Sequence, residues 1–324
     1  MKKRNKLTLV SIAMATYNGE KYIREQLDSI LNQTYKNIEL IITDDKSNDN
    51  TINIIKEYQK KDNRLKLYQN EINLDFVKNF EKAIGLCNGE YIALADQDDI
   101  WKLNKLEIFL DEIKENILIY SDAELIDGMS TKLDKNLIRP NKNLVRGSCS
   151  VSLLFYNCIS GNTMMFKKEL IPYILPIPES ITFHDIWIGY VASVVGTITF
   201  TEENMIFYRR YSEQVTASRA KIKQSFSKKL LYKQQNLNDK NRNNLINYKI
   251  FLSFKNNSDE INRLLKMIIN HLETFETGYF NINLYKYLKK NKDVVFAIKN
   301  KKNRNKYARK VAYKMNLNKI TFFS

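Results

Sequence analysis

The first third of the chain alternates short apolar runs with segments that carry apolar residues at helical spacing. The apolar runs cover residues 7–16, 38–43, 64–69 and 91–95, and a helix-patterned segment follows each of them. Four such repeats predict a parallel, doubly wound α/β sheet with helices on both faces. Right-handed crossovers bring the carboxyl ends of the strands to one edge, where open α/β sheets bind their ligands.

The pattern changes twice further along the chain. Between residues 117 and 208 it predicts short strands and one apolar helix, which Phe183–Trp187 opens and which runs through Val195, whereas residues 128–150 are polar and predict a mobile loop over the site. After residue 225, glycine and proline become rare, and residues 260–275 carry a clear helical stripe of apolar side chains. We therefore predict an α/β domain over residues 1–224 and a helical region over residues 225–324.

Polar clusters follow three of the predicted strands, at residues 16–20, 44–49 and 96–99. The last cluster places Asp96, Asp98 and Asp99 within four positions at the end of a buried strand. Carboxylates this close repel one another unless a cation or a proton offsets their charge. A hard cation such as Mg²⁺ or Mn²⁺, shared with substrate phosphates, fits these oxygens, but an acidic turn that only caps the next helix fits the same residues.

Other chemistry-bearing residues each allow two interpretations. Thr16, Asn18, Asp44 and Asp45 have short polar side chains that can bind a base and a ribose, or can simply shape turns at strand ends. Asp185 begins an apolar helix, so it is either a helix cap or a general base whose pKa a dry pocket raises. Spacing alone favours the cap.

Several classes of site are missing from the sequence. It has neither a Gly-x-Gly-x-x-Gly dinucleotide motif nor a P-loop, and its two histidines and three cysteines form no zinc motif. Three unpaired cysteines suit a reducing compartment, and neither a secretory signal nor an apolar membrane span is predicted. An anionic substrate would thus be held through a bridging cation.

The basic charge is confined to one end of the chain. Residues 225–324 hold 22 Lys and Arg against 6 Asp and Glu, a balance of +16, whereas residues 1–224 hold 30 of each. Basic helices of this kind bind anionic lipid surfaces, and residues 299–319 have the spacing of an interfacial helix. A solvated basic bundle is the main alternative. Nucleic acid is not expected, because no nucleic-acid-binding motif accompanies the charge.

An ordered set of motifs carries a family resemblance over residues 7–218. The sequence resembles the family 2 glycosyltransferases of the A-type nucleotide-sugar fold. More narrowly, it is similar to the rhamnosyltransferase-like members of bacterial surface polysaccharide synthesis. The matching segments are Val10–Gly19, Asp44-Asp45 with Ser47, Asp49 and Thr51, Asp96–Trp101 with Lys105-Leu106, His184-Asp185 and Tyr208-Arg209.

This resemblance implies a metal-dependent, inverting enzyme that moves one sugar from a nucleotide-diphosphate donor to a growing, lipid-linked glycan. It implies a cytoplasmic protein on the inner face of the bacterial membrane. Asp185 would be the catalytic base, and Asp96 and Asp98 would hold Mg²⁺ or Mn²⁺. The nucleotide sugar would contact Thr16, Tyr17, Asn18, Glu20, Asp44, Asp45, Asn79, Asp96, Gln97, His184 and Arg209.

The chain departs from the family pattern at two places. Asp75 stands where the family usually has glycine, and Tyr211 ends a Tyr-Arg-Arg-Tyr segment where the family often reads Tyr-Arg-Gln-His. No Gln-x-x-Arg-Trp motif occurs, so a processive synthase is not expected. Two rival functions are a sugar-phosphate nucleotidyltransferase, which would need a Gly-rich basic loop after the first strand, and an inactive scaffold of polysaccharide assembly.

Overall fold

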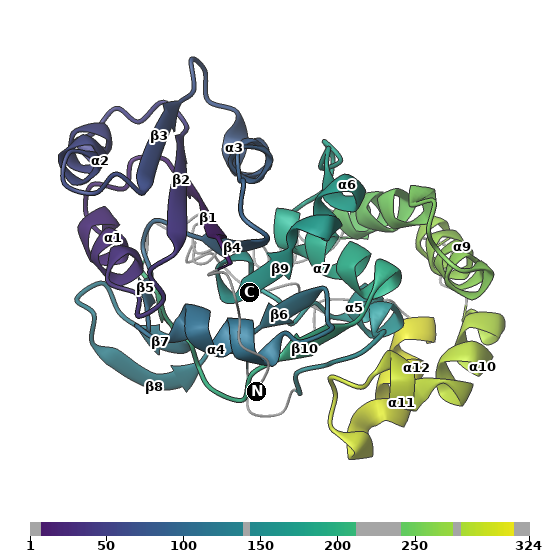
Figure 1. The fold of residues 1–324 in the computed structure, drawn as a ribbon. Helices are drawn as coiled ribbons and strands as arrows, with labels where there is room; N and C mark the ends of the chain where they lie inside the picture. The colour runs from purple at the N-terminus through teal and green to yellow at the C-terminus, as the bar shows by residue number, and fades with distance from the viewer. Residues whose placement is uncertain (1–7, 139–142, 212–240, 275–279, 314–324) are drawn as a thin grey trace, which may run out of the picture.

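The computed structural model describes residues 8–138, 143–211, 241–274 and 280–313 (Figure 1). Its centre is a seven-stranded sheet in the order β10-β6-β9-β4-β1-β2-β3. All neighbouring strands are parallel except β9, which runs antiparallel to both β4 and β6. The predicted, mostly parallel sheet is therefore confirmed. Its strands are β1 (Val10–Thr16), β2 (Ile38–Asp44), β3 (Leu65–Gln69), β4 (Tyr91–Ala95), β6 (Leu118–Tyr120), β9 (Met164–Lys167) and β10 (Ile198–Phe200).

Helices cover both faces of this sheet because alternate strand residues point to opposite sides. Ile12 and Ile42 belong to one hydrophobic cluster, and their neighbours Ala13 and Ile41 belong to the other. Helices α1 (Ile23–Leu31), α2 (Thr51–Gln59) and α4 (Lys105–Glu112) complete the first cluster. Helices α3 (Asp75–Gly85), α5 (Ser150–Phe155) and α7 (His184–Val195) complete the second.

A second, four-stranded sheet was not predicted. Its order is β5-β11-β7-β8, with bounds β5 (Ile100–Trp101), β11 (Ile206–Arg209), β7 (Glu124–Ile126) and β8 (Lys132–Asn136). The prediction of an irregular loop over residues 128–150 is wrong for β8, which pairs with β7. All five β8 side chains are exposed, so the strand has no apolar alternation to reveal it. Residues 139–142 of that predicted loop lie outside the described residues.

The basic C-terminal region is helical, as predicted. It comprises the helical residues 241–253, α9 (Asp259–Glu273), α10 (Ile282–Lys290), α11 (Lys292–Val295) and α12 (Arg304–Tyr313). This region shares a hydrophobic cluster with the α/β sheet, and the rings of Tyr190 in α7 and Phe251 stack at 4.3 Å. Figure 1 shows α9 to α12 on the side of the molecule away from α1 and α2.

Two further predictions concern this end of the chain. The proposed domain boundary at residue 225, and the end of the predicted interfacial helix beyond residue 313, lie outside the described residues. Over the described ranges, no helix is both long and apolar enough to span a bilayer.

Candidate active site

A cavity of about 690 Å³ opens at the carboxyl ends of the central strands. The register explains why it forms there: Thr16 pairs with Asp44, and Met14 pairs with Ala95, so β1, β2 and β4 end side by side. Most of the predicted site residues line this cavity, which brings the three polar clusters and the start of α7 together. They are Thr16, Tyr17, Asn18, Asp45, Asn79, Asp96, Gln97, Asp98, His184 and Asp185.

Asp44 and Glu20 are not among the lining residues, because their side chains fasten the loops around the cavity. The Asp44 carboxylate is fully buried and accepts hydrogen bonds from the hydroxyls of Thr16 and Ser47, both at 2.7 Å. The Glu20 carboxylate accepts the backbone N–H of Asn50 at 2.8 Å. These contacts tie the loop after β1 to the loop after β2. The structure thus places both residues beside the predicted nucleotide site rather than in its wall.

Gln97 connects the acidic segment to the first loop. Its side-chain amide accepts the Tyr17 N–H and donates to the Tyr17 carbonyl oxygen, both at 2.9 Å. A side chain at Gly19 would force the Gln97 amide to move, because a Cβ there would lie 2.3 Å from the amide oxygen. The sequence Tyr-Asn-Gly therefore keeps a tight turn over Gln97.

Asp45 stands where β2 leaves the sheet, and it organises the far wall of the cavity. Its carboxylate accepts the side-chain amide of Asn70 at 2.9 Å and the backbone N–H of Leu74 at 2.7 Å. The same Asn70 amide donates to Asn79 at 3.0 Å. Asp45 and Asn79 are thus held in place by one buried polar network while both line the cavity.

The acidic segment after β4 concentrates negative charge in a poorly solvated place. Burial, and then the neighbouring carboxylates led by Asp99, raise the pKa of Asp96 well above its ordinary value. Burial and the charge of Asp98 likewise raise the pKa of Asp99. Lys105 is fully buried, and its burial lowers the pKa of its ammonium group well below the ordinary value despite the nearby carboxylates. Both signs of charge are therefore costly here without a ligand.

One turn, over Ser160–Thr163, connects the acidic segment to the start of α7. The Asn162 amide donates to the Asp99 carboxylate, and the Asn162 carbonyl accepts the Lys105 ammonium group at 2.8 Å. The backbone N–H of the neighbouring Gly161 acts to lower the pKa of the Asp185 carboxyl, against the larger effect of burial. Gly161 must be small, because a Cβ there would lie 2.6 Å from Nε2 of His184. This turn fixes Asp99 and Asp185 relative to each other.

His184 and Asp185 are both buried at the cavity wall. Burial lowers the pKa of His184 to about 3, so its ring is neutral, and the ring stacks on Phe80 at 4.1 Å. Burial raises the pKa of Asp185 to about 7. Within the described residues, both ring nitrogens of His184 and Oδ1 of Asp185 have no hydrogen-bond partner. A buried carboxylate with an unpaired oxygen and this pKa can accept a proton near neutral pH.

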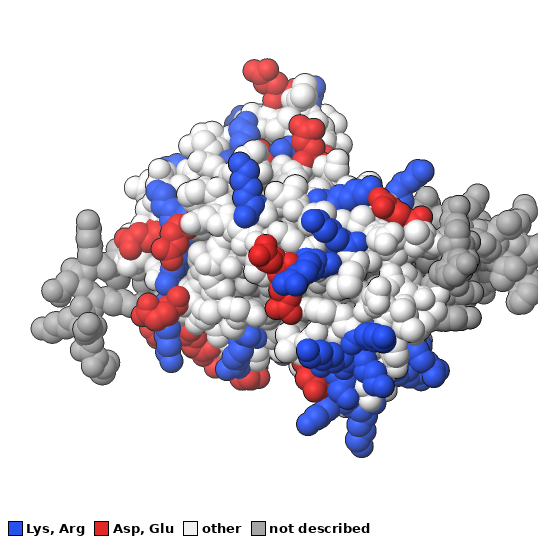
Figure 2. Space-filling view, turned by 90° about the vertical axis from the view of Figure 1, so that its right-hand side faces the viewer, with Lys and Arg blue, Asp and Glu red and all other residues white. Residues whose placement is uncertain are grey.

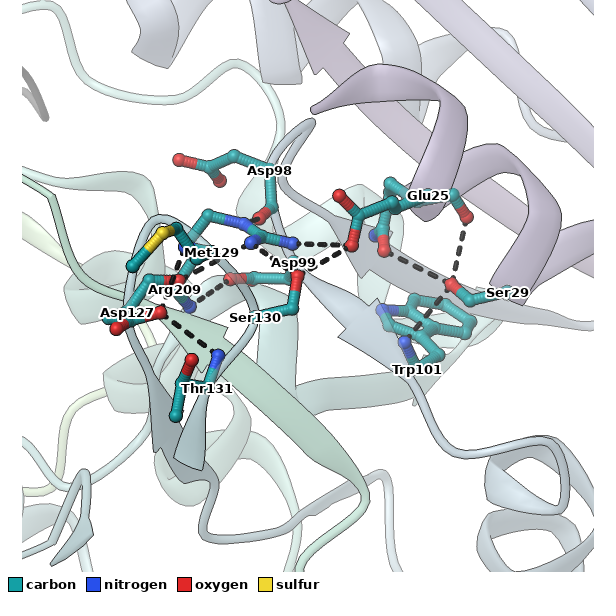
Figure 3. A network of polar contacts seen from close by, with 11 residues as sticks. Glu25, Ser29, Asp98, Asp99, Trp101, Asp127, Met129, Ser130, Thr131 and Arg209 are labelled. Carbon is teal, nitrogen blue, oxygen red and sulfur yellow. Dashed lines mark hydrogen bonds and ion pairs between the residues drawn. The ribbon is translucent and has the colours of Figure 1, made fainter. Parts of the chain in front are cut away.

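Arg209 occupies a different place from the one predicted. It was expected to contact the nucleotide sugar, but its guanidinium is fully buried and does not line the cavity. Figure 3 shows it bonded to the Asp98 carbonyl at 2.7 Å, to the Ser130 hydroxyl at 2.9 Å and to the Glu25 carboxylate at 3.0 Å. These groups hold the Arg209 guanidinium next to the acidic segment. Arg209 therefore supports the backbone of that segment.

Apart from Tyr17, the aromatic residues of the cavity wall were not assigned to the site, because single aromatic positions look the same as core positions in a sequence. They are Tyr22, Phe76, Phe80, Phe183, Tyr208 and Tyr211.

Asp75, another lining residue that was not assigned to the site, has a φ of 68°, a left-handed conformation that glycine adopts freely. Aspartate is tolerated there because its carboxylate accepts the following N–H, of Phe76, at 2.6 Å. The departure from the family's usual glycine therefore places an additional carboxylate at the cavity without changing the turn.

The lining residues suit a hard divalent cation. Among the described residues, no three His, Cys, Asp or Glu side chains are placed to enclose a cation by themselves. Asp96 and Asp98 nevertheless offer carboxylate oxygens at one cavity, and Mg²⁺ commonly binds one or two carboxylates together with substrate phosphates. Burial and the neighbouring carboxylates raise the pKa of Asp96, and a bound divalent cation would act in the opposite direction.

Comparisons with known sequences agree on one family. The model of glycosyl transferase family 2 matches residues 11–171. The uncharacterized glycosyltransferase RT0329 of Rickettsia typhi is 30% identical over 225 residues, which are 67% of this chain and 68% of that protein. An uncharacterized glycosyltransferase of Haemophilus influenzae is 33% identical over 173 residues, 50% of this chain, so the chain spans 52% of that relative's length.

One relative whose name states a reaction matches a shorter part of this chain. The Escherichia coli UDP-Glc:alpha-D-GlcNAc-diphosphoundecaprenol beta-1,3-glucosyltransferase WfgD is 36% identical over 151 residues, 45% of this chain and 58% of that protein.

Solved structures show the same fold at low sequence identity. S. aureus TarS 1–349, in complex with UDP-GlcNAc, has a TM-score of 0.59 at 19% identity and covers 93% of this chain and 87% of that one. The mannosyltransferase PcManGT from Pyrobaculum calidifontis, in complex with GDP-Man and Mn²⁺, has a TM-score of 0.52 at 17% identity, covering 65% and 59%. The predicted A-type nucleotide-sugar fold is thereby confirmed.

Proposed function

Since this chain belongs to glycosyl transferase family 2, we propose that it moves one sugar, with inversion, from a nucleotide-diphosphate sugar to a growing bacterial surface glycan. One observation carries the proposal: the buried carboxylate of Asp185 and the carboxylates of Asp96 and Asp98 line the same cavity. Inverting transfer needs both a proton acceptor and a way to neutralise a departing diphosphate. The cavity holds candidates for both.

In the proposed mechanism, Asp185 takes the proton of an acceptor hydroxyl. The hydroxyl oxygen attacks the anomeric carbon as the bond from that carbon to the diphosphate oxygen breaks, so the configuration inverts. Asp96 and Asp98 would hold a divalent cation, which supplies positive charge for the leaving diphosphate. His184, neutral and packed on Phe80, keeps the approach to Asp185 dry and uncharged. Asp45, just after β2, and Asn79, in α3, would hold the base and ribose.

The donor is left open by the comparisons and is the first thing to measure. The two solved structures named above hold UDP-GlcNAc and GDP-Man. The experiment is a thermal-shift and hydrolysis screen of the full chain with UDP-, dTDP- and GDP-sugars, with Mn²⁺, with Mg²⁺ and with EDTA. A cation-dependent rise in melting temperature with one nucleotide class is expected. It should be lost in Asp98→Ala.

Two results would count against the proposal. If no nucleotide sugar shifts or is cleaved while the protein is folded, the chain is an inactive scaffold. If a sugar phosphate and a nucleoside triphosphate are joined instead, it is a nucleotidyltransferase. Equal shifts with and without the cation would remove the metal role and leave the transfer reaction in place.

The acceptor is proposed to be lipid-linked, because the protein carries a surface suited to an anionic membrane. Residues 280–313 hold eleven Lys and Arg against one acidic residue, Asp293. Figure 2 shows Lys and Arg gathered over α10 to α12. Three large apolar side chains, Phe280, Ile282 and Val294, are also exposed there. Cationic groups beside exposed apolar groups favour the interface of an anionic bilayer.

A vesicle assay tests this surface with a matched control. Changing the exposed pair Lys301 and Lys302 to Glu should lower binding to phosphatidylglycerol vesicles by at least about tenfold, since each lysine near the surface adds about 1 kcal/mol. The same change at the exposed pair Lys60 and Lys61, just beyond α2, should leave binding almost unchanged. Equal effects of the two pairs would indicate only a general charge effect. Absence of binding by the unaltered chain would remove the membrane proposal.

A further inference from the structure

Tyr211 lies two residues beyond the end of the short strand β11, with Arg210 between them. Its hydroxyl donates to Oδ2 of Asp98 at 2.8 Å, and its half-buried ring lines the cavity. The ring packs against Tyr22 with centroids 4.9 Å apart and planes at 53°. The Tyr211 hydroxyl therefore donates a hydrogen bond to one of the two carboxylates that the proposed function assigns to the cation.

The backbone on each side of the Tyr211–Asp98 hydrogen bond is itself held by a further hydrogen bond. On the Asp98 side, the backbone carbonyl accepts Nε of the buried Arg209 at 2.7 Å, which fixes the main chain of the acidic segment (Figure 3). On the Tyr211 side, the Arg210 N–H donates to the Ile126 carbonyl at 2.8 Å, which continues the pairing of β11 with β7. Asp98 is therefore held at two points: Arg209, at the end of β11, bonds its backbone carbonyl, and Tyr211 bonds its carboxylate.

We propose that Tyr211 positions the Asp98 carboxylate for the divalent cation, through the hydrogen bond from its hydroxyl to Oδ2. This inference rests on the proposed function. A carboxylate that coordinates a cation is commonly held by such a hydrogen bond, and losing the partner typically weakens metal binding 10–100-fold. The hydroxyl adds orientation to a side chain that otherwise rotates about two bonds.

The two residues assigned to the cation, Asp96 and Asp98, both offer carboxylate oxygens. Oxygen donors suit Mg²⁺ and Mn²⁺, whereas imidazole donors favour softer ions such as Zn²⁺ and Ni²⁺. Mn²⁺ is therefore the appropriate probe, since it resembles Mg²⁺ in its ligands and is visible by electron paramagnetic resonance.

The test is a Mn²⁺ titration of the full-length protein, without nucleotide, followed by electron paramagnetic resonance. Tyr211→Phe should raise the Mn²⁺ dissociation constant 10–100-fold. Tyr22→Phe is the matched control: it removes a hydroxyl from the ring beside Tyr211, and within the described residues that hydroxyl has no hydrogen-bond partner. Its Mn²⁺ dissociation constant should equal that of the unaltered protein. Both variants should keep a cooperative thermal transition in EDTA.

The outcomes separate this inference from the proposed function. Equal Mn²⁺ affinity of Tyr211→Phe and the unaltered protein would overturn the positioning role while leaving the cation in the reaction. A similar loss in Tyr22→Phe would also overturn it, because the loss would then not depend on the hydrogen bond to Asp98. If the unaltered protein binds no Mn²⁺ yet transfers sugar in EDTA, the cation and the role of Tyr211 both fail, and the transferase function stands.

Discussion

The guanidinium of Arg209 lies 3.0 Å from the carboxylate of Glu25, and this ion pair joins β11 to α1 across the base of the acidic segment. Its two partners are unequal, because the Arg209 side chain is 0% exposed whereas that of Glu25 is 45% exposed. The arginine is thus a buried cation that several oxygens share, and the glutamate is its half-solvated counter-ion. That asymmetry decides what substitutions should do.

We expect Arg209→Met to lower the free energy of unfolding by about 3 kcal/mol or more, because it strips a buried network of its central donor. Glu25→Gln should lower the free energy of unfolding by at most about 1 kcal/mol. Arg209 still donates hydrogen bonds to other oxygens in this variant, and solvent partly screens the ion pair. Urea denaturation of both variants measures the difference. Unchanged stability of Arg209→Met together with weaker nucleotide binding would instead restore the predicted contact to the nucleotide sugar.

Gly161→Ala should impair transfer with little loss of fold. Its new Cβ would lie 2.6 Å from Nε2 of His184, so the ring and the adjoining Asp185 must shift. A misplacement of about 1 Å in a catalytic group can cost about 100-fold in rate. Gly85→Ala, in α3, is the control, because its Cβ would meet only Leu175 at 3.9 Å. Equal turnover of the two variants would show that His184 and Asp185 tolerate displacement.

The rate of transfer should depend on pH through Asp185. Burial raises the pKa of this carboxyl to about 7, and a base acts only in its ionised form. The rate should therefore rise about tenfold per pH unit below pH 7 and level off above it. Asp185→Asn should lose about 10²–10⁴-fold in rate at pH 8 with nucleotide affinity unchanged. A variant that keeps near-normal turnover would show that another group takes the proton.

The same burial should make Asp185 a destabilising group at high pH. Its pKa is higher in the folded chain than in the unfolded one, so its contribution to stability is complete below about pH 4 and is lost as pH rises through about 7. Asp185→Asn cannot ionise. The melting temperature of this variant should increasingly exceed that of the unaltered protein between pH 5 and pH 8. A constant difference over that range would mean that the carboxyl is not buried as described.

The sequence was sufficient where a residue's environment follows from its neighbours along the chain. Strands β1, β2 and β4 are continuous apolar runs, and the polar residues directly after them meet because parallel strands end together. The position of Asp96 and Asp98 in the cavity follows from this local rule. The helix that begins at His184 was equally clear from its apolar stretch.

The sequence was insufficient where contacts between distant segments determine a residue's environment. Arg209 was expected to contact the nucleotide sugar, and nothing in the sequence marks Lys105 as buried. Both are buried because partners from remote segments surround them. Strand β5 has two residues and β8 has no apolar face, so neither has a period to detect. The cavity's aromatic wall depends on how α3 and α7 approach each other, which periodicity does not report.

The antiparallel strand β9 has a consequence for how the chain is made. It lies between β4 and β6, although β6 precedes it in sequence and follows β4 after only the two-residue strand β5 and helix α4. Consecutive strands linked in this way tend to pair with each other. During synthesis, β4 and β6 leave the ribosome before residues 164–167 are available, so their mutual edges must stay apart or separate again. Open strand edges invite pairing with other chains. Until residues 164–167 are available, the edges of β4 and β6 that β9 later covers are therefore open to such pairing.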